Sequence, residues 1–304
     1  MSDLASHLAD YLKLRRAAGF KLVFDGTVLP QFVAYVQAAG SPALTVDLAV
    51  EWAGLPQDVL PISLAHRLGA IRGFARYLKA IDPATEIPPL GIWPSRAPRP
   101  APYLWSAEEI DRLLHAARGI GPPLRAATYE TLFALLAVTG MRIGEAMGLG
   151  RNDIDFAAGV ITIREAKFDR ERLVPVHSST ADALTAYACR RDERFPRSAS
   201  FFVSTVGTAL RYSSVRATFI ELATSIGLRT ATQRPRIHDL RHSFTVRTLI
   251  QWHRSGTVIA AGMPVLSTYL GHVNPSGTYW YLSAAPELME LAAARLEGRF
   301  GGRS

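Results

Sequence analysis

Cysteine is almost missing from this chain of 304 residues, which contains Cys189 and no other. A single thiol forms no intramolecular disulfide, so the composition suits a reducing compartment. Cys189 lies in the segment ADALTAYACRR (181–191), whose composition favours a helix. We therefore expect a buried structural thiol at this position rather than a nucleophile.

Long apolar runs are missing as well. The first residues, MSDLASHLADYLKLRR, contain no apolar core followed by a small-residue cleavage site, and no stretch approaches the length of a membrane span. There is also neither an internal repeat nor a low-complexity tract. These features predict a cytoplasmic protein with no membrane partner, in which 48% hydrophobic residues suffice for a sizeable core.

Lysine is scarce, since the 34 basic residues comprise 30 arginines and 4 lysines. The formal net charge is +8 and the sequence pI is near 9.9. Such an excess favours an anionic partner, either nucleic acid or a membrane surface, although a merely basic surface has the same composition. Because Lys167 is the only lysine after Lys79, its position is informative.

The chain up to about Lys79 has a helical pattern, since apolar residues recur at steps of three and four. The clearest predicted helix runs from about Ser63 to Lys79 and has an apolar stripe along one side. Arg72, Arg76 and Lys79 line up beside this stripe, where they either contact DNA phosphates or form a solvated basic edge. We predict that residues 1–82 form a helical DNA-binding domain.

A proline-rich segment separates this domain from the rest of the chain. Seven prolines fall between Asp82 and Trp105, which excludes a continuous helix or a central strand. Residues 83–104 are therefore expected to form a semi-rigid linker. A second domain, residues 105–304, then opens with a capping box from Ser106 to Glu109.

The second domain has the pattern of helices around one small sheet. Residues 131–138 form a nearly all-apolar helix that Gly140 ends. The runs 160–164 and 173–176 are rich in β-forming residues and are joined by a polar turn, as in a β-hairpin. A further helix is expected over 286–296. The predicted fold class is mainly α with a small antiparallel β-sheet.

Four short segments far apart in the sequence carry side chains suited to phosphate chemistry. They are TGMRIGEAMGL with Arg142, ITIREAKFDRERLVPV with Lys167, HDLRH with His238 and Arg241, and LGHVNPSGTYWY with His272 and Tyr281. An enzyme that attacks a phosphodiester without a metal must supply fixed positive charge, a strong nucleophile and a proton donor. Arginine forks, imidazoles, a lysine and a tyrosine meet these needs.

Some of these residues also have simpler interpretations. HDLRH places His238 and Arg241 at i and i+3, so both can reach one phosphate, while we expect His242 to point elsewhere and to have a structural role. Arg142 taken alone is typical of a surface salt bridge. His272 taken alone is typical of an exposed residue that follows the C-cap glycine of a helix.

Together the four segments resemble the motifs of the tyrosine recombinase family, which includes the phage integrases and the Xer proteins. The resemblance covers nearly the whole chain. It implies an enzyme that cuts and rejoins double-stranded DNA without a metal, a cofactor or ATP. It also implies a two-domain DNA clamp, made of a helical core-binding domain and an integrase-type catalytic domain. Four protomers, or an assembly with related recombinases, would act on two DNA sites.

The resemblance identifies Tyr281 as the nucleophile that forms a 3′-phosphotyrosyl bond. Tyr281 follows His272 by nine residues, which is the usual interval in the family. Asn274-Pro275 favours the start of a new helix between these two residues. Tyr279 and Trp280 compete with Tyr281 for the reactive or packing position.

The other roles implied by the resemblance complete a catalytic set. Arg142 and Arg241 would hold the phosphate, and His238 would assist proton transfer to and from the tyrosine. Glu145, one turn after Arg142, would orient the site. Lys167 matches the hairpin lysine that acts as a general acid on the 5′-hydroxyl, although a lysine at a hairpin tip is by itself typical of a solvated side chain.

The chain departs from the family pattern between Arg241 and His272, where it is several residues longer than the commonest members, and this leaves the path of 252–264 open. The segment TYWYLSAAPELM (278–289) looks more like integrases of transposons and genomic islands than like chromosome-dimer resolvases. No arm-binding module is expected before Leu4. Two alternatives remain open, namely a type IB topoisomerase-like enzyme that relaxes DNA and a DNA-binding accessory protein without catalysis.

Overall fold

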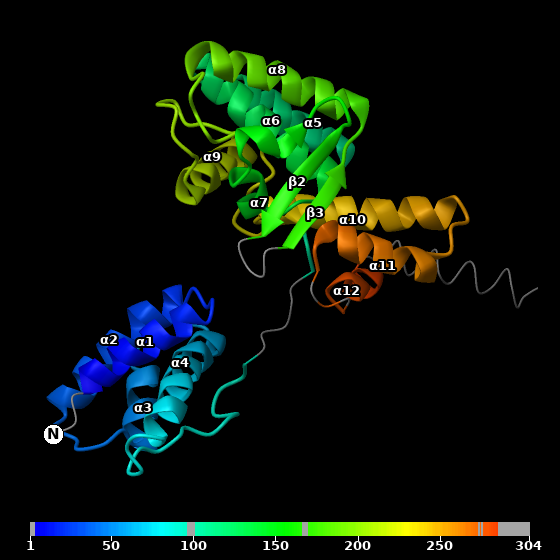
Figure 1. Cartoon of the computed structure of the whole chain (residues 1–304). Helices are drawn as coiled ribbons and strands as arrows, with labels where there is room; N and C mark the ends of the chain where they lie inside the picture. Colours follow the sequence, from blue (N-terminus) through cyan, green and yellow to red (C-terminus); the bar gives the residue numbers. More distant parts are fainter. Residues whose placement is uncertain (1–3, 96–100, 166–169, 273, 275, 285–304) are drawn as a thin grey trace, which may run out of the picture. The chain divides into compact units, whose positions relative to one another are not determined.

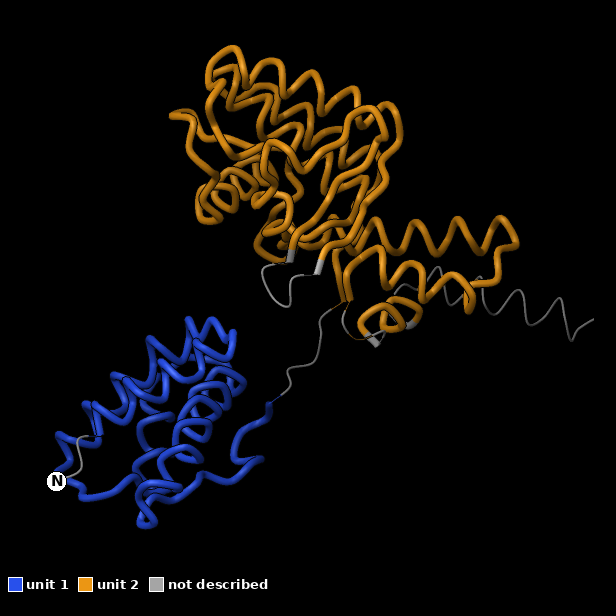
Figure 2. The backbone as a smooth tube through the Cα atoms, in the orientation of Figure 1, with its two compact units in different colours: residues 1–100 blue, residues 101–304 orange. Residues whose placement is uncertain are grey.

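The computed structural model describes residues 4–95, 101–165, 170–272, 274 and 276–284. The chain divides into two compact units, residues 1–100 and 101–304, which are coloured separately in Figure 2. Each unit has an apolar core of its own. Within the described ranges, no helix is long and apolar enough to cross a membrane.

The described residues of the first unit form four helices, in agreement with the spacing of apolar residues (Figure 1). They are α1 (Leu4–Ala17), α2 (Val23–Ala38), α3 (Val46–Gly54) and α4 (Pro61–Lys79). Helix α4 begins two residues earlier than predicted, because proline is well suited to the first turn of a helix. Ile71 and Phe74 of α4 lie in one core with Phe32 of α2 and Trp52 of α3.

The basic side of α4 contacts the proline-rich segment that follows it. Arg72 donates hydrogen bonds to two backbone carbonyls within residues 83–104, at 2.7 and 2.6 Å, and Lys79 donates to a third at 2.6 Å. Trp93 of the same segment packs against the core of the first unit. Arg76 is exposed. A role of these three basic residues in DNA contact stays a prediction.

The described part of the second unit contains eight α-helices and a three-stranded antiparallel sheet, which confirms the predicted fold class. The helices are α5 (Ala107–Arg118), α6 (Pro123–Thr139), α7 (Ile143–Met147), α8 (Ser178–Arg194), α9 (Tyr212–Ser225), α10 (Ile237–Arg254), α11 (Ile259–Leu270) and α12 (Ser276–Ala284). The sheet has the order β1 (Ile154–Asp155), β2 (Val160–Glu165) and β3 (Arg170–Pro175). A short 3₁₀ turn, η1 (Arg151–Asp153), precedes β1.

The predicted hairpin and capping box are both present. Strands β2 and β3 pair in antiparallel register, with Ile163 opposite Arg172. The Ser106 side chain accepts from the Glu109 N–H, and Glu109 returns the bond to the Ser106 N–H. Strand β1 was not predicted, because it contains only two residues. Helix α11 contacts β3, and α10 packs on α6 and α12, which brings the C-terminal helices to one end of the unit (Figure 1).

Helix α6 is buried along most of its length and ends where predicted. Its C-cap, Gly140, has a left-handed φ of 62°, a conformation that glycine adopts without a steric penalty. A Cβ atom on Gly140 would lie 2.4 Å from Cδ1 of Phe244 in α10, so a larger residue is excluded. The chain therefore turns sharply from the buried helix to Arg142, the N-cap of α7.

The prediction for Cys189 was wrong, because its side chain is exposed. The buried face of α8 contains Leu184, Tyr187 and Ala188. At about 100° per residue, position 189 falls outside this stripe. The path of 252–264, left open by the sequence, consists of the end of α10, a short connection and the start of α11. The helix predicted over 286–296 lies outside the described residues.

Candidate active site

Arg142 lies at the N-terminus of α7 as its N-cap residue. Its backbone N–H donates to Glu145 Oε2 at 2.7 Å, and its Nη1 donates to Glu145 Oε1 at 2.7 Å. Its Nη2 donates to the carbonyl of Gly271 at 2.6 Å. Glu145 thus orients Arg142 through both the backbone and the guanidinium, while 38% of the Arg142 side chain stays exposed.

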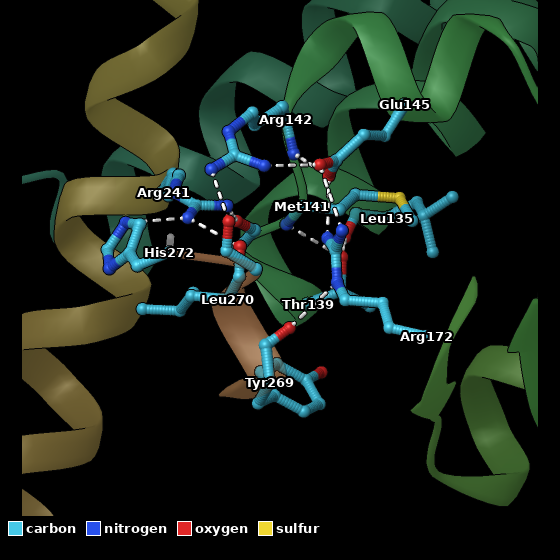
Figure 3. Close-up of polar contacts among 12 residues, drawn as sticks. Leu135, Thr139, Met141, Arg142, Glu145, Arg172, Arg241, Tyr269, Leu270 and His272 are labelled. Atoms are coloured by element: carbon cyan, nitrogen blue, oxygen red, sulfur yellow. Dashed lines mark hydrogen bonds and ion pairs between the residues drawn. The ribbon is translucent and has the colours of Figure 1, made fainter. Parts of the chain in front are cut away.

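Arg172 of β3 also binds Glu145, approaching the carboxylate from a different side than Arg142 (Figure 3). Its Nη1 and Nη2 donate to the two carboxylate oxygens at 3.0 and 2.7 Å, and its Nε donates to the Tyr269 carbonyl at 3.1 Å. Both side chains of this pair are only 11% exposed. Burial alone would raise the pKa of Glu145, but the hydrogen bonds and charges of Arg172 and Arg142 lower it overall.

Arg241 of α10 is almost completely buried, with 2% exposure. Its Nη1 donates to the Gly140 carbonyl at 2.8 Å, and its Nη2 donates to the Leu270 carbonyl at 2.7 Å and to His272 Nε2 at 2.8 Å. Burial, followed by the nearby charge of Arg142, lowers the pKa of Arg241 to about 10. The guanidinium therefore remains charged at neutral pH.

The C-terminus of α11 holds these three arginines together. A helix leaves its last carbonyls without intrahelical partners, and its C-terminal end carries partial negative charge. The carbonyls of Tyr269, Leu270 and Gly271 accept from Arg172, Arg241 and Arg142 respectively (Figure 3). The end of one helix thus concentrates three cationic side chains from three different elements.

Gly271 makes this arrangement possible. It caps α11 with a left-handed φ of 67°. A Cβ atom there would lie 2.7 Å from Arg172 Nη1 and 3.3 Å from Arg142 Nη1. Only a glycine lets the two guanidiniums approach the backbone this closely.

The hydrogen bonds of His272 define its protonation state. A guanidinium can only donate, so Nε2 of His272 accepts from Arg241 and carries no proton. Nδ1 then bears the hydrogen, which it donates to Thr278 Oγ1 at 2.6 Å. Burial, together with the positive charge of Arg241 and Arg142, lowers the pKa of His272 to about 4. His272 is therefore neutral near pH 7 and is linked to α12 through Thr278.

Tyr281 of α12 is 2% exposed, and its hydroxyl lies 2.7 Å from Nδ1 of His242. The expectation that His242 points away from the site was therefore wrong. His242 is four residues after His238, and residues at i and i+4 share one face of a helix. The two imidazole rings meet edge to face at 4.6 Å. Tyr279, the competing tyrosine, is 48% exposed.

The second unit therefore brings five of the six predicted catalytic residues into one electrostatically coupled cluster. Arg142, His238, Arg241, His272 and Tyr281 interact either by contact or through charge. The side chain of His238 is exposed at the surface. Partial burial of its ring and the charges of Arg241 and Arg236 lower its pKa, whereas the charge of Asp239 raises it. Lys167 lies outside the described residues.

Two residues of the cluster were missed in the sequence, although each carried a signal. Side chains along a strand alternate between its two faces, so Arg172, two residues before the buried Val174, falls on the inner face. His242 shares the helical face of His238. Among the residues that the structure describes, no group of three or more His, Cys, Asp or Glu side chains is arranged to hold a metal ion.

The model of the phage integrase family matches residues 105–287. The integrase/recombinase y4rB of Sinorhizobium fredii is 43% identical over 314 residues and covers 100% of both chains. The tyrosine recombinase XerD of Mycobacterium tuberculosis is 32% identical and covers 72% of this chain and 69% of its own.

Solved structures share the fold at lower identity. The Tn1549 transposon integrase in complex with transposon right end DNA has a TM-score of 0.66 at 17% identity, over 97% of this chain and 99% of its own. A lambda integrase tetramer bound to a Holliday junction has a TM-score of 0.62 at 17% identity, over 90% and 78%. The family match and the full-length relative together show that this chain belongs to the phage integrase family, the tyrosine-type site-specific recombinases.

Proposed function

We propose that this recombinase cleaves and rejoins double-stranded DNA through a 3′-phosphotyrosyl bond formed by Tyr281. The observation that carries the proposal is the position of Tyr281, which is buried, has its hydroxyl beside His242 and is coupled to the charge of Arg241. Attack by this hydroxyl on a phosphate leaves a free 5′-hydroxyl. The covalent bond retains the energy of the phosphodiester, so rejoining needs no ATP.

Fixed positive charge supports this reaction at the phosphate. Arg142 has the exposure that contact with a non-bridging oxygen requires. Arg241 is buried, so it supplies positive charge from beneath the site and holds His272. For its guanidinium to contact the phosphate directly, the phosphate must replace one of its present carbonyl partners. Glu145 and Arg172 keep Arg142 in place. Such preorganised charge is a principal source of catalysis for anionic transition states.

Proton transfer completes the proposed chemistry. Lys167, which the family resemblance identifies as the general acid, would protonate the departing 5′-oxygen. His238 is exposed beside Arg241 and His242, where it can assist the transfer of protons to and from the tyrosine. No step in this scheme requires a metal ion or a cofactor.

The substrate and the assembly are inferred from the neighbours. The lambda integrase neighbour is a tetramer on a Holliday junction, and the Tn1549 neighbour is bound to transposon end DNA. We infer by analogy that four copies of this chain, or this chain with related recombinases, act on two DNA sites in the cytoplasm. The helical first unit, with Arg72, Arg76 and Lys79, would bind the DNA core site. The transposon neighbour supports a mobile-element origin, and none of these relatives favours the topoisomerase alternative.

Covalent capture of DNA tests this function and finds the target at the same time. Sheared genomic DNA of the organism that encodes the protein is nicked at random and incubated with the protein in millimolar EDTA. Denaturant then stops the reaction, and DNA joined to protein is sequenced. We expect recurrent fragments with one shared core sequence. Absence of adducts with every fragment, or a strict requirement for magnesium, would contradict the proposal.

A further inference from the structure

We propose that His242 is the catalytic base that takes the proton of Tyr281 during DNA cleavage and returns it during rejoining. This inference rests on the proposed function, because it specifies how the nucleophile of that reaction is activated. Its starting point is the 2.7 Å contact between Nδ1 of His242 and the hydroxyl oxygen of Tyr281. This distance is typical of a strong hydrogen bond and suits direct proton transfer.

The enclosure of this pair favours one stable geometry. His242 and Tyr281 lie ring to ring at 5.3 Å, and Trp280 packs at 5.6 Å from His242 and 5.2 Å from Tyr281. Tyr281 is 2% exposed, so bulk water has little access to its hydroxyl. The side chain in direct contact with the hydroxyl, His242, is therefore well placed to receive the proton.

The other two histidines are less suited to this task. Both ring nitrogens of His272 are occupied, Nε2 by Arg241 and Nδ1 by Thr278. His238 contacts the ring of His242 edge to face and is itself exposed. This places His238 where it can pass a proton between His242 and solvent, one step away from the phenol.

The charges around His242 support an acceptor role. The titratable groups around His242 are His238 and Arg241 on its own helix and Tyr281 on α12. His272, between α11 and α12, is hydrogen-bonded to Arg241. The fixed positive charge of Arg241 is coupled to Tyr281 and favours transfer of the phenol proton to a neighbouring acceptor. The same charge stabilises the phenolate character that develops on Tyr281 as the proton leaves.

The proposed step conserves atoms and charge. As the bond from Tyr281 Oη to phosphorus forms, its O–H bond breaks and the proton moves to Nδ1 of His242, which becomes an imidazolium. The bond from phosphorus to the 5′-oxygen breaks, and that oxygen takes a proton from the general acid. In rejoining, the 5′-oxygen attacks phosphorus and its proton returns to the conjugate base of the general acid, while His242 returns its own proton to Oη as the bond from Oη to phosphorus breaks.

A base is needed because the free phenol is a weak nucleophile. With an ordinary pKa of about 10, only about one phenol in a thousand is ionised at pH 7. General base catalysis typically contributes about 10²- to 10⁴-fold in rate. A loss of this size is therefore the expected effect of removing His242.

The test compares His242→Asn with wild type on nicked duplexes of the captured DNA sequence. Asparagine retains a hydrogen-bond acceptor near the position of Nδ1 but accepts no proton. His253→Asn, on the same helix and outside the cluster, is the matched control. Single-turnover cleavage is measured from pH 5.5 to 9.5, and DNA affinity and circular dichroism are recorded for each variant.

We expect His242→Asn to fold and to bind DNA as wild type does, but to cleave about 10²- to 10⁴-fold more slowly at pH 7. Its rate should rise about tenfold per pH unit, because the phenol must ionise before it attacks. The wild-type rate should rise less steeply with pH, because His242 accepts the phenol proton directly. His253→Asn should match wild type. An unchanged rate in His242→Asn, or a slower rate with the wild-type pH profile, would show that His242 only packs against the tyrosine.

A sulfur substrate separates this step from protonation of the leaving group. When sulfur replaces the bridging 5′-oxygen, the leaving thiolate needs no proton, but the tyrosine must still lose one. His242→Asn should remain slow on this substrate, and recovery to the wild-type rate would overturn the proposal. If wild type itself forms no adduct, the proposed function fails. If both proteins form adduct equally fast, the proposed function stands and only the role of His242 is refuted.

A second variant keeps the proposal testable if His242→Asn does not fold. His242→Ala opens a space beside Tyr281, and added imidazole can enter it and accept the proton. We expect imidazole to accelerate cleavage by His242→Ala at least tenfold, in proportion to the concentration of neutral imidazole, and to leave wild type unaffected. Acceleration independent of imidazole ionisation, or none at all, would count against a base at this position.

Discussion

Replacement of Arg172 by alanine should destabilise the second unit and disorder the phosphate site. The Arg172 guanidinium makes two charged hydrogen bonds to Glu145 and one to the Tyr269 carbonyl, and both members of the ion pair are 11% exposed. Loss of one partner from a buried ion pair costs about 3–5 kcal/mol, mostly because the other charge is left buried. Glu145 retains the N–H and Nη1 of Arg142, so we expect about 2–3 kcal/mol.

The loss should depend on pH in a defined direction. Arg172 and Arg142 lower the pKa of Glu145 in the folded protein, against the effect of burial. The stability gained from this pair is therefore present above the unfolded pKa of about 4.3 and is lost as the pH falls through the lower, folded value. In Arg172→Ala, burial is less opposed and the pKa of Glu145 rises. The difference between wild type and variant should thus shrink as the pH falls below about 4.

Urea denaturation followed by circular dichroism, at pH 7 and at steps down to pH 3.5, measures this difference. Arg118→Ala is the matched control, because Arg118 pairs with Glu130 at 2.7 Å but is 59% exposed. An exposed pair contributes about 0–1 kcal/mol. Equal losses in the two variants, or a difference for Arg172→Ala that widens on acidification, would refute the reasoning.

Three further predictions concern other parts of the site. Thr278→Val conserves shape but leaves Nδ1–H of His272 without its partner, so single-turnover cleavage should slow at least tenfold with unchanged DNA affinity; an unchanged rate would show that this bond is dispensable. Lys167→Ala should be slow on natural DNA, by about two to four decades, and nearly normal on the 5′-sulfur substrate, and equal impairment on both would mean that the lysine only grips DNA. Deletion of 286–304 should spare binding to a single site in a mobility-shift assay but impair pairing of two sites, and normal recombination by the truncated chain would refute this.

Much of the fold was predictable because its signals are local. The capping box at Ser106, the glycine that ends α6 and the alternation of the β2–β3 hairpin each depend on a few neighbouring residues. Cys189 shows the limit of such reasoning. Its helix was correctly predicted, but which face of that helix is buried depends on the elements that pack against it.

The site was predictable as a set of residues but not as a set of contacts. The motif spacing identified Arg142, Arg241 and His272, which indeed lie together. The carbonyls at the end of α11 that hold the arginines come from a different part of the chain, and no local pattern indicates them. The role of Arg172 arises in the same way, since Glu145 lies 27 residues earlier in the chain.

The identity of the nucleophile tests the account most directly. The protein is incubated with a nicked duplex of the captured site, the covalent adduct is digested with a protease, and the peptide that carries the nucleotide is sequenced by mass spectrometry. We predict a 3′-phosphotyrosyl bond at Tyr281, no adduct from Tyr281→Phe despite normal DNA binding, and normal adduct from Tyr279→Phe. A nucleotide on Tyr279, or adduct formed by Tyr281→Phe, would contradict the account.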